Sequence, residues 1–260
     1  MKTRVLSGLI LAPLLLILYF GGWVLLVGCV IISLVSLKEF YTGFTKIDIV
    51  PSFVIGYFSI AVLYAFSIFL NSPIYYMFWI FAMVLCSLIY SFKKSEQNIE
   101  ASLATIVGIV YIVFFLFHVV LIDKTPGFSE FTWVVLIIAF GTDTMAYFSG
   151  FLFGKHKLCP SISPKKTIEG AIGGTIWSII FCGVFAFFFA SEYFIHLLIL
   201  GFIGSIFSQF GDLTASIFKR KMGIKDYGNL IPGHGGMLDR FDSVLFTAPI
   251  VYYYINLIIK

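Results

Sequence analysis

Charge is scarce in this sequence. Asp, Glu, Lys and Arg together make up 12% of the 260 residues, whereas a soluble domain carries about 25%. Hydrophobic residues make up 60%, and the mean hydropathy is +1.03. The apolar runs are continuous and do not alternate with polar positions, which excludes a membrane β-barrel. The composition therefore predicts an all-α, polytopic integral membrane protein.

Paired cysteines and a strong net charge are also missing. None of the four cysteines belongs to a C-x-x-C pair, and three of them lie in apolar runs, where a thiol acts as a small hydrophobe. This pattern argues against disulfides and structural zinc. The net charge of +4 is too small and too localised to indicate a nucleic-acid partner, and no nucleic-acid-binding motif is present.

Nine apolar runs organise the chain, and the basic residues between them orient it. The runs predict helices near residues 5–20, 23–37, 52–70, 74–91, 101–121, 131–153, 171–190, 195–218 and 242–259. With the N-terminus in the cytoplasm, all of the 17 Lys and Arg residues except Lys124 and Lys260 fall in inner segments. This positive-inside bias supports nine spans, with the N-terminus in the cytoplasm and the C-terminus outside. The first two runs are short for a span, and a shallow hairpin around Gly21-Gly22 is the alternative for them. A bacterial-type cytoplasmic membrane is the expected location. The bias also predicts that the polar segments 154–170 and 219–241 face the cytoplasm.

The chain divides into two regions by its content of motifs. Residues 1–125 are apolar and carry no recognisable motif, and residues 126–260 hold nearly every residue with chemical character. We therefore expect an N-terminal set of membrane helices followed by a C-terminal catalytic region.

Asp143 lies well inside the sixth run. A charged side chain at the bilayer centre costs about 2.5–3.5 kcal/mol on insertion scales. This carboxylate is therefore either hydrogen-bonded within the protein or directed into a cavity, and the default for such a residue is a functional site. Gly150 and Gly154 follow it at helical spacing, and we expect them to let a neighbouring helix pack closely.

The eighth run carries a polar stripe. Its members follow spacings of three and four residues and share one helix face: Ser205, Ser208, Asp212, Ser216 and Lys219. Hydrocarbon does not tolerate such a face, so the stripe is predicted to line a cavity or a helix contact. We expect an interhelical hydrogen bond from Ser205, and we expect Asp212, next to a basic cluster, to belong to a site.

Residues 219–241 are predicted to form a loop that mixes cations, carboxylates and glycines. The positive-inside rule alone accounts for the lysines, but it explains neither the carboxylates nor the sequence Gly233-His234-Gly235-Gly236. Carboxylates beside cations and flexible glycines suit the binding of divalent metal between phosphate groups. The loop is therefore the strongest candidate for the functional site.

A second polar loop reads SPKKTIEG from Ser163 to Gly170. Thr167 is predicted to cap the following helix, with Glu169 favourable in its first turn. Lys165 and Lys166 place two cations beside that helix N-terminus, which binds phosphate in its own right. Helix capping and an anion site are compatible, and both are expected.

These segments resemble the signature of phosphatidate cytidylyltransferases, also called CDP-diacylglycerol synthases. The resemblance covers about residues 140–242 and includes D-x-x-A-Y at 143–147 and S-P-K-K-T-x-E-G at 163–170. Its longest part is Ser216-x2-Lys219-Arg220-x4-Lys225-Asp226-x-Gly228-x3-Pro232-x-His234-Gly235-Gly236-x2-Asp239-Arg240-x-Asp242. The resemblance implies a homodimeric membrane enzyme that uses CTP, phosphatidate and Mg²⁺ and forms CDP-diacylglycerol and pyrophosphate.

The residues that match the family can be given expected roles. The resemblance implies paired metal sites, and the expected ligands are Asp212, Asp239 and, as a third contributor, Asp143. The expected catalytic residues are Lys219, Arg220, Lys225, Asp226, His234 and Arg240. The four cations among them are expected to hold the triphosphate or the lipid phosphate, and His234 is expected to contact phosphate or base. The other expected substrate contacts are Lys165, Lys166, Ser216, Gly235 and Gly236.

Two other functions were weighed against this one. In a transporter, Asp143 and Asp212 could relay protons or cations, but no repeated halves or matched broken helices are present. A CDP-alcohol phosphotransferase uses a D-G-x-x-A-R type motif on one helix, and that motif is absent from the sequence. Nucleotide-dependent lipid turnover separates the transporter from the transferase.

Asp239→Asn tests the expected metal site. The substitution removes the negative charge that a divalent ion needs and keeps the size of the side chain. We expect it to abolish turnover and to leave the fold largely intact, which is measured by product formation and by thermal unfolding in detergent. Normal turnover by this variant would contradict the assignment of Asp239 as a metal ligand.

Overall fold

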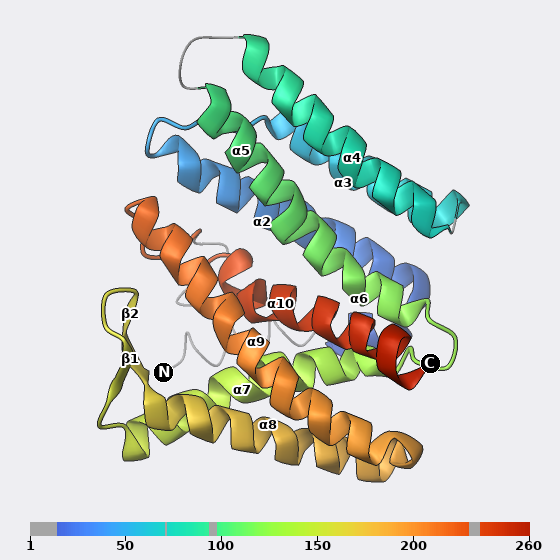
Figure 1. Cartoon of the computed structure of the whole chain (residues 1–260), viewed down its shortest axis with the longest axis vertical. Coiled ribbons are helices and arrows are strands. Elements are labelled where there is room, and N and C mark those ends of the chain that lie inside the picture. Colours follow the sequence, from blue (N-terminus) through green and yellow to red (C-terminus); the bar gives the residue numbers. More distant parts are fainter. Residues whose placement is uncertain (1–14, 71, 94–97, 229–234) are drawn as a thin grey trace. The chain divides into compact units, whose positions relative to one another are not determined.

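A computed structural model describes residues 15–70, 72–93, 98–228 and 235–260 of the chain. Its long helices are α2 (Gly22–Thr45), α3 (Phe53–Phe69), α4 (Pro73–Tyr90), α5 (Asn98–Gly108), α6 (Phe115–Asp123), α7 (Phe131–Phe153), α8 (Ile168–Phe189), α9 (Phe194–Lys221) and α10 (Leu238–Tyr254). Single-turn 3-10 helices occupy Ser91–Lys93 and Ser191–Tyr193, and π-helical stretches occupy Ile109–Phe114 and Ile255–Ile259. Two short strands, β1 (Lys157–Cys159) and β2 (Ser163–Thr167), precede α8 (Figure 1).

The predicted all-α membrane architecture is confirmed in its coarse form. Helix occurs in every one of the nine predicted segments, including residues 15–20 of the first. Seven of the described helices are long and apolar enough to cross a bilayer, and α3, with 17 residues, is shorter. Most of the first predicted helix lies outside the described residues, so the count of nine spans and the orientation stay predictions.

Several helices extend beyond the predicted limits. The second predicted helix continues to Thr45, and α9 continues through Lys219 and Arg220 to Lys221. Helix α10 begins at Leu238, so Asp239 and Arg240 are helical and do not belong to a loop. Lys and Arg are good helix formers, and an acidic residue in the first turn, such as Asp239, is favourable. Apolar content alone therefore underestimated the helices at their polar ends.

The chain forms two compact units. The first contains residues 1–117 and 221–240, and the second contains residues 118–220 and 241–260. The second half of the sequence therefore supplies part of the first unit. The division at residue 125, which separates the chain by its content of motifs, stays a prediction. Helix α10 begins in the first unit and continues in the second.

The core of the first unit lies around α2. Tyr41 is fully buried, and its hydroxyl donates a 2.8 Å hydrogen bond to the carbonyl oxygen of Thr105 in α5. Trp79 of α4 is also fully buried, and its indole N–H donates to the carbonyl oxygen of Ser59 in α3. Buried Tyr and Trp side chains need such partners, so these two hydrogen bonds fix how α2, α3, α4 and α5 pack.

The second unit is held together by glycines at helix contacts. Helices α7 and α8 run side by side (Figure 1), and a Cβ added at Gly174 of α8 would lie 2.9 Å from the carbonyl oxygen of Thr142 in α7. The predicted packing role of Gly150 is confirmed, because a Cβ there would lie 2.8 Å from Thr167 Oγ1. At Gly211 of α9, a Cβ would lie 2.6 Å from the carbonyl oxygen of Asp242 in α10. Small residues thus bring helix backbones together next to Asp212.

The segment between α7 and α8 is a β-hairpin, although the sequence predicts a loop there. Strands β1 and β2 pair antiparallel, with Lys157 opposite Thr167 and Cys159 opposite Ser163. The predicted cap is confirmed: Thr167 has extended backbone angles, and its hydroxyl accepts a 3.1 Å hydrogen bond from the N–H of Gly170. The hairpin is therefore followed directly by the first turn of α8.

Gly174→Ala tests the close approach of α7 and α8. Backbone atoms cannot move aside for the added methyl group, so we expect the free energy of unfolding to fall by about 1–3 kcal/mol. Thermal unfolding in detergent measures the change. Gly183→Ala on the same helix is the matched control, because its Cβ would meet only the flexible end of Leu198, at 3.0 Å. Equal unfolding temperatures for the two variants would contradict the proposed packing.

Candidate active site

A cavity of about 580 Å³ opens in the second unit. Its lining comes from α7, the β-hairpin, α8 and α9 and combines polar and charged side chains with apolar ones. The polar residues that line it are Asp143, Tyr147, Lys157, Lys165, Lys166, Thr167, Gln209 and Asp212. Carboxylates and ammonium groups surrounded by apolar helices are typical of a binding site for a charged ligand.

Lys166 and Asp212 form an ion pair in this cavity. Lys166 Nζ lies 2.5 Å from Asp212 Oδ2, and about a quarter of each side chain is exposed, 25% and 27% respectively. The hydroxyl of Ser216, one helical turn further along α9, lies 3.5 Å from Asp212 Oδ1. The pair joins β2 to α9 and keeps both charges in contact with the cavity. A ligand phosphate would meet a cation and a carboxylate at the same place.

Asp143 is hydrogen-bonded and lines the same cavity. The hydroxyl of Ser243 in α10 donates a 2.7 Å hydrogen bond to Asp143 Oδ2. Asp242 directly precedes Ser243 in α10. It is 6% exposed and lies within electrostatic range of Asp143, Asp212 and Lys219. The two interpretations left open for Asp143 therefore both apply, since it has a partner in the protein and faces the cavity.

The polar stripe on α9 is turned into the protein. Ser205 and Ser208 are fully buried, and Ser216 is 8% exposed. The Ser205 hydroxyl donates to the carbonyl oxygen of Phe202 in its own helix. The prediction that Ser205 forms an interhelical hydrogen bond is therefore wrong. A serine that bonds back to its own helix satisfies its hydroxyl without a second helix. Asp212 is the member of the stripe that reaches the cavity.

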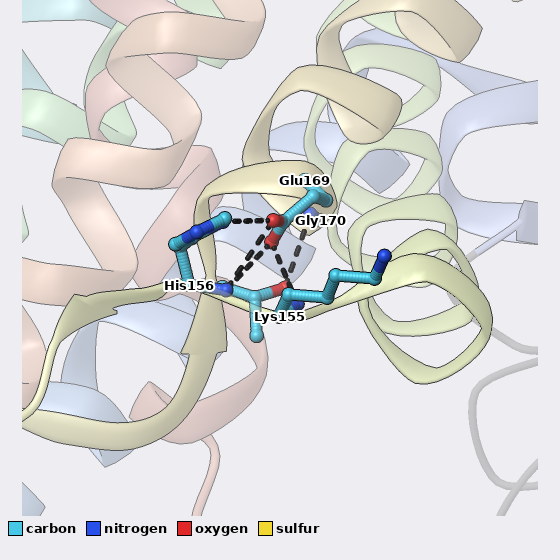
Figure 2. Close-up of polar contacts among 5 residues, drawn as sticks. Lys155, His156, Glu169 and Gly170 are labelled. Atoms are coloured by element: carbon cyan, nitrogen blue, oxygen red, sulfur yellow. Dashed lines mark hydrogen bonds and ion pairs between the residues drawn. The ribbon is translucent and has the colours of Figure 1, made fainter.

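Glu169 fastens the hairpin to the start of α8, as Figure 2 shows. Its Oε2 accepts from the backbone N–H groups of Lys155 at 3.1 Å and His156 at 3.2 Å, and its Oε1 lies 2.6 Å from His156 Nδ1. A carboxylate in the first turn of a helix also interacts favourably with the helix dipole. The contact fixes the residues just before β1, which begins at Lys157. It thereby holds the hairpin whose second strand carries Lys165 and Lys166.

Arg220 connects the end of α9 to the hairpin turn. Its Nε donates a 3.3 Å hydrogen bond to the carbonyl oxygen of Ile162, between β1 and β2, and the side chain is exposed. Lys219 is half-buried in the same helical turn. Of the expected phosphate-binding cations of α9, Arg220 therefore contacts the hairpin that carries Lys165 and Lys166.

The remaining predicted residues belong to the first unit. Asp239 Oδ2 accepts hydrogen bonds from the N–H groups of Tyr227 at 2.8 Å and Gly236 at 2.9 Å. Gly235 has φ +85°, a conformation that glycine adopts without strain. Lys225 and Asp226 are exposed and Arg240 is half-buried, whereas His234 lies outside the described residues. The N–H of Gly236, expected to approach a phosphate, donates instead to Asp239.

Two polar residues that line the cavity are not among the predicted site residues, namely Lys157 and Gln209. Gln209 of α9 lines the cavity, and its amide donates to the carbonyl oxygen of Ala171 at 3.3 Å and to Thr175 Oγ1 at 3.1 Å. Its place four residues after Ser205 and three before Asp212 extends the polar stripe and could have revealed it. Lys157 carried no signal beyond the positive-inside rule.

A second cavity adjoins the first and is almost entirely apolar. It has a volume of about 540 Å³ and shares Leu158, Ala171 and Gln209 with the polar cavity. Its other lining residues come mainly from α8 and α9 and include Ile172, Ile176, Ile179, Phe202 and Ile206. Charged and apolar surroundings therefore lie next to each other, separated by the three shared residues.

The carboxylates suit a magnesium ion that is shared with a substrate. Among the described residues, no group of three or more His, Cys, Asp or Glu side chains is positioned to hold a metal ion. Asp143 and Asp212 nevertheless line one cavity. Mg²⁺ is commonly bound by one or two carboxylates together with water and substrate phosphates, so these two residues fit that mode of binding.

The sequence matches a family model described as the cytidylyltransferase family over residues 2–258. The chain belongs to this family, which confirms the resemblance.

Relatives named phosphatidate cytidylyltransferase align with almost the whole chain. The protein of Staphylococcus haemolyticus (strain JCSC1435) is 39% identical over 265 residues, which cover 96% of this chain and 97% of the relative. The protein of Staphylococcus aureus (strain COL) is 35% identical over 264 residues with the same coverage. The protein of Bacillus subtilis (strain 168) is 43% identical over 122 residues, 46% of this chain and 45% of the relative.

Glu169→Gln tests the fastening of the hairpin. The amide keeps one oxygen acceptor and loses the charge, so we expect faster hydrogen exchange at the N–H groups of Lys155 and His156. Hydrogen exchange followed by mass spectrometry measures this local change. Glu192→Gln is the matched control, since Glu192 is an exposed acid of the same unit outside the cavity lining. Unchanged exchange in the Glu169 variant would show that the carboxylate does not hold the hairpin.

Proposed function

We propose that this enzyme transfers CMP from CTP to phosphatidate and forms CDP-diacylglycerol and pyrophosphate. The observation that carries the proposal is the polar cavity with Asp143, Lys166 and Asp212, which adjoins an apolar cavity within a membrane protein. Membership of the cytidylyltransferase family and the relatives' names support the same reaction. A charged headgroup and long acyl chains need these two environments side by side.

One phosphatidate molecule occupies both cavities, with its headgroup in the polar cavity and an acyl chain in the apolar one. The lipid phosphate lies in the polar cavity near Lys165 and Lys166, where cations offset its charge. An acyl chain follows the apolar cavity along α8 and α9, whose side chains exclude water from it. The headgroup therefore meets soluble CTP while the chains stay in the hydrocarbon.

The reaction is an in-line displacement at the α-phosphorus of CTP. An oxygen of the phosphatidate phosphate forms the new P–O bond, and the bond from the α-phosphorus to the bridging oxygen breaks as pyrophosphate leaves. The second pKa of a phosphate monoester is about 6, so the nucleophile is already largely ionised at neutral pH. A strong general base is unnecessary, and the chemistry depends on electrostatic stabilisation.

The chain's own residues hold the two polyanions together. Lys219 and Arg220 of α9, with Lys225 and Arg240, bind the triphosphate or the lipid phosphate. Arg can bind a phosphate bidentately, whereas Lys acts as a point charge. The substrate-binding and catalytic set is completed by Ser216, Gly235, Asp226 and His234.

Mg²⁺ is the proposed cofactor. Asp143, Asp212 and Asp239 would hold it, in two sites. When bound, Mg²⁺ supplies positive charge between the two substrates and neutralises the leaving group. The Lys166–Asp212 ion pair then has a second purpose, since Lys166 orients the Asp212 side chain in the cavity.

The proposed setting follows from the substrates and the charge pattern. CTP is soluble and cytoplasmic, and the positive-inside bias orients the polar segments toward the cytoplasm. The protein therefore works in a cytoplasmic membrane with its site on the inner face. We also propose that it acts as a homodimer, as the family resemblance implies.

Product formation by the purified protein in detergent tests the function. Phosphatidate and labelled CTP are supplied with Mg²⁺ or with EDTA, and labelled CDP-diacylglycerol is expected only with the metal. Asp212→Asn and Asp143→Asn are each expected to lower kcat by about 100-fold or more, because removing one electrostatic contact to the reacting centre commonly has that effect.

Asp48→Asn is the matched control for these two variants. Asp48 is exposed in the first unit and has φ 60°, a conformation that Asn also tolerates. It is expected to keep normal activity. Labelled product from wild type in EDTA, or full activity of both cavity variants, would contradict the metal-dependent mechanism.

A further inference from the structure

Glu39 binds the segment that opens α10. It lies in α2, and its half-buried carboxylate accepts the backbone N–H of Met237 on Oε1 at 2.9 Å and that of Leu238 on Oε2 at 2.8 Å. The first N–H groups of a helix have no partner within the helix, and a negative charge near them is favourable. Both oxygens of one side chain therefore hold two consecutive residues of the family signature.

The backbone passes so close to this carboxylate that a side chain at Gly228 or Gly236 would displace it. A Cβ added at Gly236 would lie 2.5 Å from Glu39 Oε2, and one added at Gly228 would lie 2.7 Å from Oε1. The glycines of the signature thus let two stretches of backbone close over the carboxylate. This contact gives Gly228 and Gly236 a physical role that does not involve a ligand.

Asp239 completes the arrangement one residue beyond the contact with Glu39. Its Oδ2 accepts hydrogen bonds from the N–H groups of Tyr227 and Gly236, so it joins Tyr227 to the residues that open α10. The Tyr227 ring packs on Phe40, the neighbour of Glu39 in α2, with ring centroids 6.1 Å apart. Two carboxylates from distant parts of the sequence therefore hold the backbone at Tyr227 and at residues 236–238 through four N–H groups.

We propose that Glu39 is a positioning residue for the transferase reaction. Its carboxylate binds the N–H groups of Met237 and Leu238 and thereby sets the place from which Asp239 and Arg240 act on the substrates. The proposal rests on the proposed function, in which those two residues contact metal or phosphate. It gives the N-terminal helices a task in catalysis, because α2 carries the residue that holds the signature.

The chemistry of the contact dictates the variants. Glu39→Gln keeps the size of the side chain but turns one acceptor into an NH₂ group, which would face a backbone N–H. Glu39→Asp keeps both acceptors and the charge on a side chain one methylene shorter. Glu100→Gln is the matched control, since Glu100 is an exposed acid in the first turn of α5 of the same unit.

Three measurements on the full-length protein in detergent test the proposal. The first is hydrogen exchange of the peptide that covers Met237 and Leu238, without substrate. The second is kcat and the KM for CTP, counted per folded protein, and the third is thermal unfolding. We expect Glu39→Gln to speed exchange in this peptide and to lower kcat by about 10- to 100-fold, the scale of a small displacement of catalytic groups. Glu39→Asp is expected to recover part of kcat, and Glu100→Gln to match wild type.

Each other outcome decides against the proposal. Faster exchange with unchanged kcat would show that the contact is merely structural, as would a loss of activity explained fully by loss of folded protein. Unchanged exchange would show that Glu39 does not hold the segment. If Glu39→Gln does not fold, Glu39→Asp provides the test. Normal exchange in that variant together with no activity above background would also contradict the proposal.

Failure of the proposed function gives a different result. Wild-type protein would then form no CDP-diacylglycerol, although exchange at Met237 and Leu238 would still respond to Glu39→Gln. If wild-type protein forms no such product, the catalytic part of the inference is wrong. The exchange data alone would then test whether Glu39 binds the N–H groups of Met237 and Leu238.

Discussion

The ion pair between Lys166 and Asp212 is the interaction on which the cavity depends. A single charge among apolar helices is costly, and here each charge has the other beside it. Because Lys166 comes from β2 and Asp212 from α9, the pair also fixes the hairpin against the helix that carries the polar stripe. The glycine contacts of α8 with α7 and of α9 with α10 bring the backbones near enough for this geometry.

Both polar segments are organised in the same way by carboxylates. Glu169 binds the N–H groups of Lys155 and His156, and Glu39 binds those of Met237 and Leu238. An ionised carboxylate makes stronger hydrogen bonds to N–H groups than a neutral acceptor does. Loops rich in glycine and lysine can thus hold a defined conformation, which catalysis requires because displaced groups lose rate steeply.

Local sequence signals predicted the features that depend on neighbouring residues. The periodicity of Ser205, Ser208 and Asp212 correctly placed them on a face turned away from lipid, and Thr167 was correctly predicted to cap α8. The family signature was also recognisable, because its polar positions are fixed over a short span of sequence. The helix limits were less accurate, since hydropathy does not register the helical propensity of polar ends.

The contacts that bridge long stretches of sequence could not be predicted. Glu39 and Leu238 are 199 residues apart, and neither periodicity nor a motif marks Glu39 in a region that looked featureless. Gln209 was missed for a related reason, because its partners lie on α8, 34 and 38 residues away. Such contacts are set by helix packing, which a single sequence does not reveal. The short β-hairpin could not be predicted either, because its strands of three and five residues are too short to show an alternation of apolar and polar residues.

The central claim is that the polar cavity of the second unit binds the reacting phosphates. An experimental structure with Mg²⁺, phosphatidate and a CTP analogue that cannot be cleaved between the α- and β-phosphates tests it most directly. The account predicts phosphate density against Lys166 and Asp212, with metal density at Asp212 or Asp143 and an acyl chain in the apolar cavity beside them. Substrate phosphates bound elsewhere, with the Lys166–Asp212 ion pair intact and no ligand in the cavity, would contradict it.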